Sequence, residues 1–191
     1  RVTEDFKIPG IQELKLRGAY GTAGQRPAFA DQYEVMSINQ GNTTKEQQGN
    51  KMLKPSLSKE WEAAINIEFL SRLSFELIHS VTNTTDQILA VPLPVQYGGW
   101  PSQVRNAGSL NSKVWEASLN AQIIRKKDMM YNITFIFDRV KTKITELDVP
   151  PFQTGPQGQE ADKCFYIREG EVFGAMYGYK FLTSLEEMEE Q

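Results

Sequence analysis

Few residues in this chain are suited to covalent or metal chemistry. Its 191 residues include one Cys, Cys164, and one His, His79, so they cannot form a zinc site from His and Cys ligands alone. These two residues are also the only available Cys–His nucleophile pair, and His79 lies in an alternating, strand-like segment that argues against that role. The motifs CxxC, GxSxG, HExxH and GxxxxGK[ST] do not occur. We therefore predict no catalytic residue and no metal site.

Acidic residues are the other candidates for chemistry, as paired carboxylates in general acid–base catalysis. Five glutamates stand in alternating segments: Glu60, Glu62, Glu68, Glu76 and Glu116. A carbohydrate-active enzyme could use Glu60 and Glu62, whose Cα atoms would lie ~6.6 Å apart on one face of a strand. Acid–base catalysis also needs an enclosed pocket that shifts a pKa, and no partner residue for either glutamate is visible. A polar sheet face explains these residues, and we expect neither an enzyme nor a cofactor.

Aromatic residues in loop-like segments are the candidates for binding. Phe29, Tyr33, Tyr97 and Trp100 lie among Gly, Pro, Gln and Asn residues. They could stack on a sugar ring or contact a partner lipoprotein. Packing of the loops against each other is the favoured interpretation, since long ordered loops are held by their own side chains. Ligand binding by these four residues is the functional hypothesis that we keep beside it.

Composition limits the class of protein. The formal net charge is −3, from 21 Lys and Arg against 24 Asp and Glu, so there is no basic excess that would indicate a nucleic-acid partner. Aromatic residues make up 10% of the chain, which argues against disorder. No run approaches the ~18 apolar residues of a membrane-spanning helix.

Period-two alternation of apolar and polar residues dominates the chain and predicts antiparallel β-strands. Each run covers about nine to eleven residues, the length of a tilted strand that crosses a bilayer, whereas ordinary strands average ~5–6. One face of each run is apolar, with aromatic residues near the ends, such as Trp61 and Phe69 or Tyr131 and Phe137. The other face carries Glu, Asn, Gln and Ser. These features favour a transmembrane β-barrel with aromatic girdles.

Connections between these runs alternate in length. Residues 69–72 and 125–128 predict tight turns, whereas residues 22–57, 83–105 and 143–170 predict long loops. Short turns at one end and long loops at the other are typical of an outer-membrane barrel, whose long loops are extracellular.

The two ends of the sequence indicate a piece of a larger protein. The chain begins at Arg1 without Met or a signal peptide, and it ends where Ser184 and Glu187 predict a capping box at the start of a helix. We expect residues 1–191 to form one partial β-barrel domain.

Several short motifs resemble those of the TonB-dependent outer-membrane receptors, in particular the SusC/RagA type of Bacteroidetes. In family order they are LKLRGAYGTAG at 14–24, NKMLKP at 50–55 with EWE at 60–62, TTDQIL at 84–89 with VPLP at 91–94, NAGSL at 106–110 with KVWE at 113–116, and IREGEVFGAMYGYK at 167–180. Gln25, Val114 and Val172 depart from the family's usual Asn, Gly and Pro, which affects individual turn geometries. The motifs together cover nearly the whole chain.

This resemblance implies a role in TonB-dependent transport of a bulky nutrient, such as an oligosaccharide, a peptide or a chelate, across the bacterial outer membrane. It implies a barrel of about 22 strands with a plugged lumen, of which this chain supplies wall and extracellular loops, with the plug domain and the terminal strand absent. The implied partners are the TonB complex, outer-membrane lipid and a SusD-like surface lipoprotein. The alternative is a soluble β-sandwich carbohydrate-binding module, in which a second sheet would cover the apolar faces.

Overall fold

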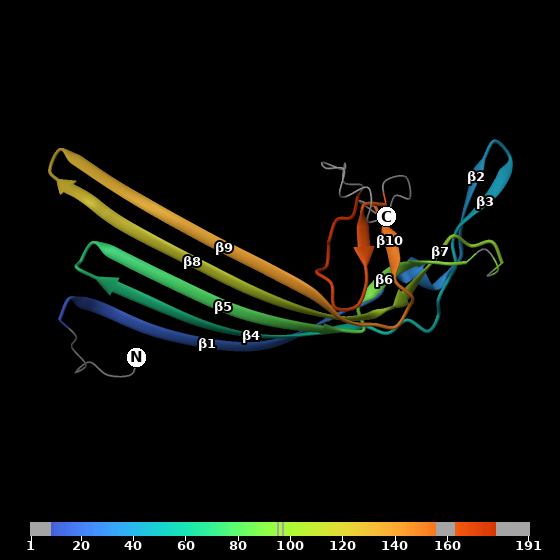
Figure 1. Cartoon of the computed structure of the whole chain (residues 1–191), viewed down its shortest axis with the longest axis horizontal. Coiled ribbons are helices and arrows are strands. Elements are labelled where there is room, and N and C mark those ends of the chain that lie inside the picture. Colours follow the sequence, from blue (N-terminus) through green and yellow to red (C-terminus); the bar gives the residue numbers. More distant parts are fainter. Residues whose placement is uncertain (1–8, 95, 97, 156–162, 179–191) are drawn as a thin grey trace, which may run out of the picture.

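The fold is one long antiparallel sheet with short hairpins at one end. The computed structural model describes residues 9–94, 96, 98–155 and 163–178, so the predicted helix start at residues 184–187 lies outside the described part. Five strands pair in the order β1-β4-β5-β8-β9 (Figure 1). They are β1 (Ile11–Gln25), β4 (Ser56–Phe69), β5 (Leu73–Thr85), β8 (Gly108–Lys126) and β9 (Met129–Leu147). This up-and-down antiparallel arrangement confirms the predicted all-β fold class, part of a large transmembrane β-barrel with long extracellular loops.

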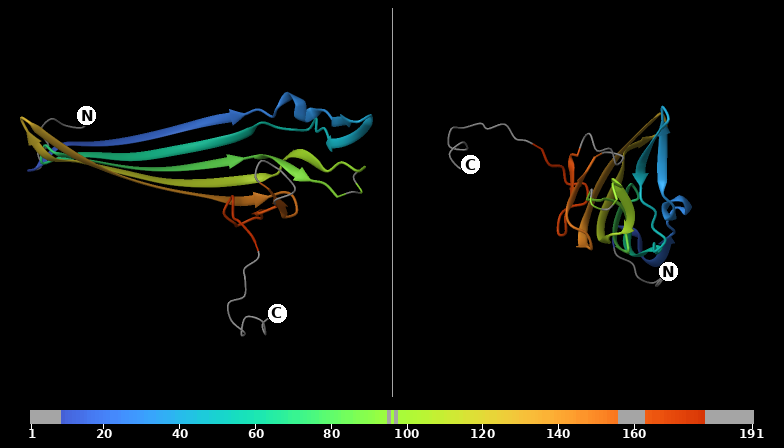
Figure 2. Two further views of the ribbon diagram at one scale, coloured as in Figure 1. Left: turned by 90° about the horizontal axis from the view of Figure 1, so that it is seen from above. Right: turned by 90° about the vertical axis from the view of Figure 1, so that its right-hand side faces the viewer.

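Three hairpins lie within the predicted long loops. They pair β2 (Val35–Asn39) with β3 (Asn42–Gln47), β6 (Ile88–Pro92) with β7 (Ser102–Asn106), and β10 (Phe152–Thr154) with β11 (Phe165–Ile167). A single turn of 3₁₀-helix, η1 (Phe29–Gln32), precedes β2. All three hairpins lie at the end opposite the tight turns (Figure 2). The predicted loops are therefore more ordered than their composition indicated.

The long strands exceed the predicted nine to eleven residues. They span 13 to 19 residues, and β8 and β9 each have 19. The alternating apolar pattern stops short of the hairpin end of each strand, and pairing continues there through polar residues such as Ser112 and Thr142, whose hydroxyl oxygens lie 2.9 Å apart. The apolar pattern therefore located the apolar band of the sheet correctly and underestimated the length of the strands.

The register places the predicted apolar residues on one face of the sheet. One row across the sheet is Leu14, Ile67, Phe75, Leu119 and Phe135, and the next is Leu16, Ile65, Leu77, Ala117 and Phe137. Leu16 is 71% exposed and Phe135 is 62% exposed. No second sheet packs on this face in the described part of the chain. A soluble sandwich would require such a layer, so that alternative is not favoured.

Two further features define the ends of the sheet. At the turn end, three residues connect β4 to β5; Leu70 and Ser71 have positive φ, and the Arg72 N–H donates to the Phe69 carbonyl oxygen at 3.3 Å. At the hairpin end, the most buried apolar side chains are Ala107, Ile144 and Ile167, which form a small packed centre where the loops meet the strands. Within the described ranges, no helix has the length and apolar character needed to cross a membrane.

Candidate functional site

The apolar face is bounded by an aromatic belt on the side of the hairpins. Trp115 stacks on His79 with ring centroids 3.9 Å apart, and Trp61 contacts the same imidazole edge-on at 5.9 Å. The Nδ1 atom of His79 donates a hydrogen bond to the Val114 carbonyl oxygen, 2.8 Å away. Because this bond and the stacking hold the ring at the sheet surface, His79 is part of the belt, as its place in the alternation predicts.

The belt and the turn end of the strands set the height of the apolar band. Trp61 and Phe69 are eight residues apart on β4, which corresponds to ~26 Å along the strand. At a barrel tilt of ~40° this becomes ~20 Å across the membrane, close to the apolar band of outer-membrane barrels, ~25 Å. The height of the apolar band is therefore suited to a bilayer with a thin hydrocarbon region.

The opposite face is polar and carries the glutamates that sequence analysis considered. The Glu76 carboxylate pairs with the Arg17 guanidinium, and Glu60 Oε2 accepts a hydrogen bond of 2.9 Å from Thr82 Oγ1. A shallow hollow of about 160 Å³ lies on this face beside Asn66. The Oδ1 atom of Asn66 is buried and accepts no hydrogen bond from the described residues. The glutamates thus line an open polar wall.

Phe29 and Tyr33 form one exposed aromatic pair at the hairpin end. Their rings meet edge-to-face with centroids 5.5 Å apart, and they remain 78% and 50% exposed. The 3₁₀ turn that carries Phe29 is held by Asp31, whose carboxylate accepts a hydrogen bond of 3.1 Å from the Ala28 N–H. The structure brings these two predicted residues together and leaves both rings accessible.

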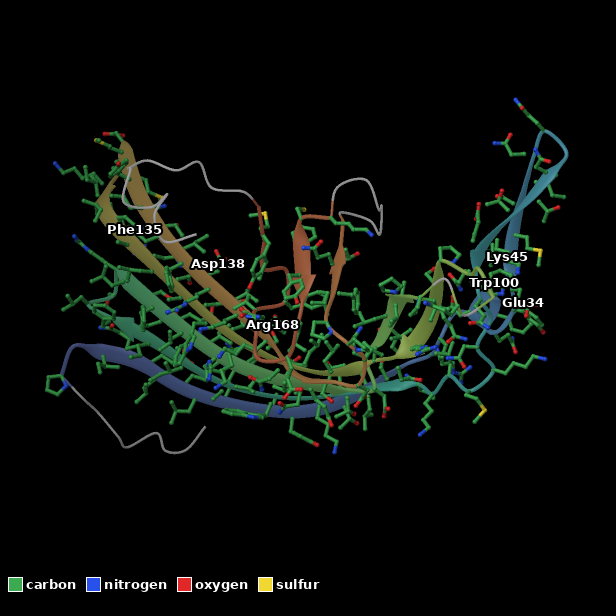
Figure 3. All side chains as sticks on the ribbon, turned by 45° about the vertical axis from the view of Figure 1, so that its right-hand side comes forward. Glu34, Lys45, Trp100, Phe135, Asp138 and Arg168 are labelled. Atoms are coloured by element: carbon green, nitrogen blue, oxygen red, sulfur yellow. The ribbon has the colours of Figure 1, made fainter. Side chains whose placement is uncertain are left out.

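Trp100 lies elsewhere among the hairpins and is only 9% exposed. Lys45 Nζ is 5.2 Å from the centroid of its ring and donates a hydrogen bond of 2.7 Å to the Gly98 carbonyl oxygen. Figure 3 shows Lys45 and Trp100 together at this end, while Phe135 lies toward the turn end of β9. These contacts give Trp100 a packing role between the first and second long loops. Tyr97 lies outside the described residues.

Side-chain amides join the same two loops, although no local sequence pattern marks them. Asn106 Oδ1 accepts a hydrogen bond from the Lys54 N–H at 2.8 Å, and its Nδ2 donates to the carbonyl oxygens of Lys54 and Asp86. Asn50 Nδ2 donates to the Val104 carbonyl oxygen at 2.9 Å, and Gln103 Nε2 donates to that of Gly49 at 2.9 Å. These hydrogen bonds hold the two loops together at the hairpin end.

A cleft of about 520 Å³ opens among β3, β6, β7 and β10. Its walls combine charged and apolar side chains, including Lys45, Glu46, Pro101 and Phe152. This volume is in the range of ligand pockets, ~300–1,000 Å³. In the segment after β11, a hydrogen bond from Arg168 to Glu171 raises the pKa of the guanidinium above its usual value. Backbone hydrogen bonds join this segment to β9: Phe173 N–H donates to the Thr142 carbonyl oxygen at 2.9 Å, and Ile144 N–H donates to that of Glu171 at 3.0 Å.

A single-layered sheet with an apolar band, an aromatic belt, a polar opposite face and ordered loops at one end is the wall of a large β-barrel. Comparison with known proteins gives the same class. Residues 7–159 match the family described as TonB dependent receptor-like, beta-barrel. The chain belongs to this family of TonB-dependent receptors, in the SusC/RagA type that its motifs predicted, and its location is the bacterial outer membrane.

Individual relatives support this assignment. A TonB-dependent receptor of Formosa agariphila is 29% identical over 184 residues, covering 90% of this chain and 18% of the relative. The TonB-dependent receptor SusC of Bacteroides thetaiotaomicron is 25% identical over 175 residues, covering 84% of this chain and 16% of SusC. The RagAB peptide importer in its closed-closed state has a similar fold, with a TM-score of 0.67, 20% identity, and coverage of 90% of this chain and 18% of that one. The chain thus spans less than a fifth of the length of these relatives.

Proposed function

We propose that this chain forms part of the barrel wall and the extracellular loops of a TonB-dependent importer for a bulky nutrient. The observation that carries this proposal is the five-stranded sheet, which has an exposed apolar band on one face and charged residues on the other. Five strands do not close a barrel, so further strands and a plug domain come from segments outside residues 1–191. We call the protein with all these segments the intact receptor.

The polar face is the proposed contact surface for the plug. Arg17, Glu60 and Glu76 line it with charge, and the buried Asn66 Oδ1 offers an acceptor for a donor on the plug. A buried acceptor without a partner costs about 1–3 kcal/mol, which favours completion by a neighbouring segment. In this account the glutamates hold and release the plug, and the chain catalyses no reaction.

The hairpin end is the proposed contact surface for the nutrient and for a SusD-like surface lipoprotein. Phe29 and Tyr33 are accessible for stacking on a nutrient. Trp100 is buried under the Lys45 ammonium group and packs the loops together. The substrate class is an oligosaccharide, a peptide or a chelate, because all are too bulky for diffusion through an open pore. Energy comes from the TonB complex through segments outside this chain.

The test is uptake by cells that carry the intact receptor as their only route for a labelled nutrient. Candidate oligosaccharides, peptides and chelates are supplied in turn, and the nutrient that accumulates identifies the substrate class. Deleting the receptor gene or inactivating TonB should each abolish accumulation. Accumulation that persists without TonB, at the level of the parent strain, would overturn the proposed transport.

The aromatic pair gives a residue-level prediction. Replacing both Phe29 and Tyr33 by Ala should raise the nutrient concentration for half-maximal uptake roughly ten-fold, since each lost aromatic contact contributes about 0.5–1.5 kcal/mol. The matched control is Met52→Ala, which removes an 83% exposed apolar side chain from the same loop and should leave uptake unchanged. Equal effects of the double variant and the control would contradict a binding role for the pair.

A further inference from the structure

The two faces of the sheet differ in charge around the aromatic belt. The polar face carries Glu60 and Glu62 on β4, and Glu116 pairs with Asp138 on that face one row from Trp115 toward the turns. On β8 and β9 the apolar face carries four cations, Arg139 at the belt and Lys113, Lys141 and Lys143 just beyond it. We call these four residues the basic cluster. Their position on the lipid-facing side is set by the same period-two alternation that places Phe135 and Phe137 there.

The register crowds these four charges together. Lys113 pairs directly with Lys141, and Arg139 and Lys143 lie two residues to either side of Lys141 on the same face. Like charges directly opposite each other on two strands destabilise a sheet. All four side chains are exposed, and none has a hydrogen bond or ion pair with another described residue. The repulsion is therefore uncompensated within the described part of the chain.

Nearby acidic groups do not neutralise the basic cluster. On the five strands the one acid with the same facing is Glu146, beyond Lys143, and its Oε2 accepts a hydrogen bond of 3.3 Å from Ser109. On the segment that pairs with β9 beyond its edge, Val172 stands opposite Lys143, and the neighbouring Glu171 pairs with Arg168. The positive charge of the basic cluster is therefore available to the molecules that surround the outer wall of the barrel.

The belt identifies what covers it. Trp115 pairs with Arg139 in the register, and the Lys113–Lys141 pair is the next row on the same face toward the extracellular hairpins. Tryptophan rings of aromatic belts lie at the level of the lipid headgroups, so the basic cluster lies at or just above that level. Anionic headgroups attract basic residues there. The outer wall at this height faces lipid, and the groups of opposite charge available in lipid are phosphates.

We propose that the basic cluster binds a phosphate group on a lipid of the outer leaflet. One phosphate between β8 and β9 would approach Lys113 and Lys141 from opposite sides, and the Arg139 guanidinium could bind two of its oxygens. The bound lipid would relieve the cross-strand repulsion and fix the depth of this part of the wall in the membrane. This site is separate from the proposed nutrient contacts, so its failure would leave the transport proposal standing.

The experiment measures lipid binding to the purified intact receptor in neutral detergent. The probe is diphosphoryl lipid A, and the readout is the number of lipids retained in native mass spectrometry together with the thermal unfolding midpoint. Replacing Lys113 and Lys141 by Gln should weaken binding of the probe roughly ten-fold or more, since each basic residue near an anionic lipid surface contributes substantially to affinity. Without lipid, the variant should unfold at the same or a higher temperature than the parent protein, because the like-charge pair is gone.

The controls separate this site from general charge effects. Replacing Lys126 and Lys127 by Gln removes the same charge at the turn end of the strands and should leave probe binding unchanged. Inorganic phosphate at the same concentration should not raise the unfolding midpoint; an equal rise would mean a simple anion site and overturn the lipid assignment. Unchanged lipid A binding by the Lys113 and Lys141 double variant would also overturn the proposal.

Discussion

Replacing Phe135 by Arg in the intact receptor should destabilise the folded barrel by about 2–4 kcal/mol, the cost of a charged residue on the lipid face at the bilayer midplane. Phe135 lies midway between Arg139, at the belt, and Tyr131, near the turn end of β9. Its ring is in the row of apolar side chains that runs from Leu14 across all five strands. A guanidinium at this height has no protein partner and would have to be solvated within the hydrocarbon.

The adjacent residue provides a matched control. Ile136 is 77% exposed and Phe135 is 62% exposed, so both are large apolar residues on the surface of β9. They differ in facing: Ile136 pairs with Ser118 on the polar face. Ile136→Arg should cost less than about 1 kcal/mol, because the new charge points toward the lumen. Denaturant unfolding of the receptor in bilayers, followed by gel mobility, measures both variants. Equal costs would contradict the assignment of the two faces.

Replacing Gly108 by Ala should destabilise the hairpin end by about 3 kcal/mol, combining backbone strain with a steric clash. Gly108 has φ +152°, and a Cβ there would lie 2.1 Å from the Glu146 carbonyl oxygen. That oxygen belongs to the backbone of β9, so the strands must separate. Separation would also strain the neighbouring hydrogen bonds, from Gln87 N–H to the Gly108 carbonyl oxygen at 2.8 Å and from Asp148 N–H to that of Ala107 at 3.1 Å.

Another glycine in the same sheet separates this clash from the general effect of adding a methyl group. Nothing lies within 4 Å of a Cβ built on Gly21 in β1, so Gly21→Ala should change stability by less than about 0.5 kcal/mol. Limited proteolysis of the hairpin end reports the local opening, and the unfolding midpoint reports the whole barrel. If Gly108→Ala resists protease as well as Gly21→Ala does, the tight approach of β8 to β9 is not present in the receptor.

The sequence predicted the strands and their facing where one side of the sheet meets lipid. There, residues such as Leu16, Phe75 and Phe135 must alternate with polar ones, so the pattern carries the register. Beyond the belt both faces of the sheet are exposed to water, and apolar and polar residues no longer alternate. For this reason the sequence pattern did not predict the hairpins. β3 consists of Asn42–Gln47, with no apolar residue, and the available signal was the turn at Gln40 and Gly41, both with positive φ.

The candidate site was predictable only in part, because its contacts join distant segments. The aromatic residues stood out by type, but exposure separates Phe29 and Tyr33 from the buried Trp100. The partner of Trp100 is Lys45, 55 residues earlier, and Asn106 bonds to the backbone of Lys54, 52 residues earlier. Local patterns do not encode such pairings, since they depend on how two long loops fold over the end of the sheet.

The most direct test of the central claim is a scan of single cysteines along β9 from Tyr131 to Arg139 in the intact receptor, with Cys164 replaced by Ser. Each cysteine carries a nitroxide spin label, and its accessibility is measured to oxygen, which partitions into lipid, and to a water-soluble nickel chelate. We predict strict alternation: labels at Ile133, Phe135 and Phe137 accessible to oxygen, and labels at Thr134, Ile136 and Asp138 accessible to the chelate. Uniform accessibility along the strand, or alternation of the opposite sense, would contradict a wall with lipid on its apolar face.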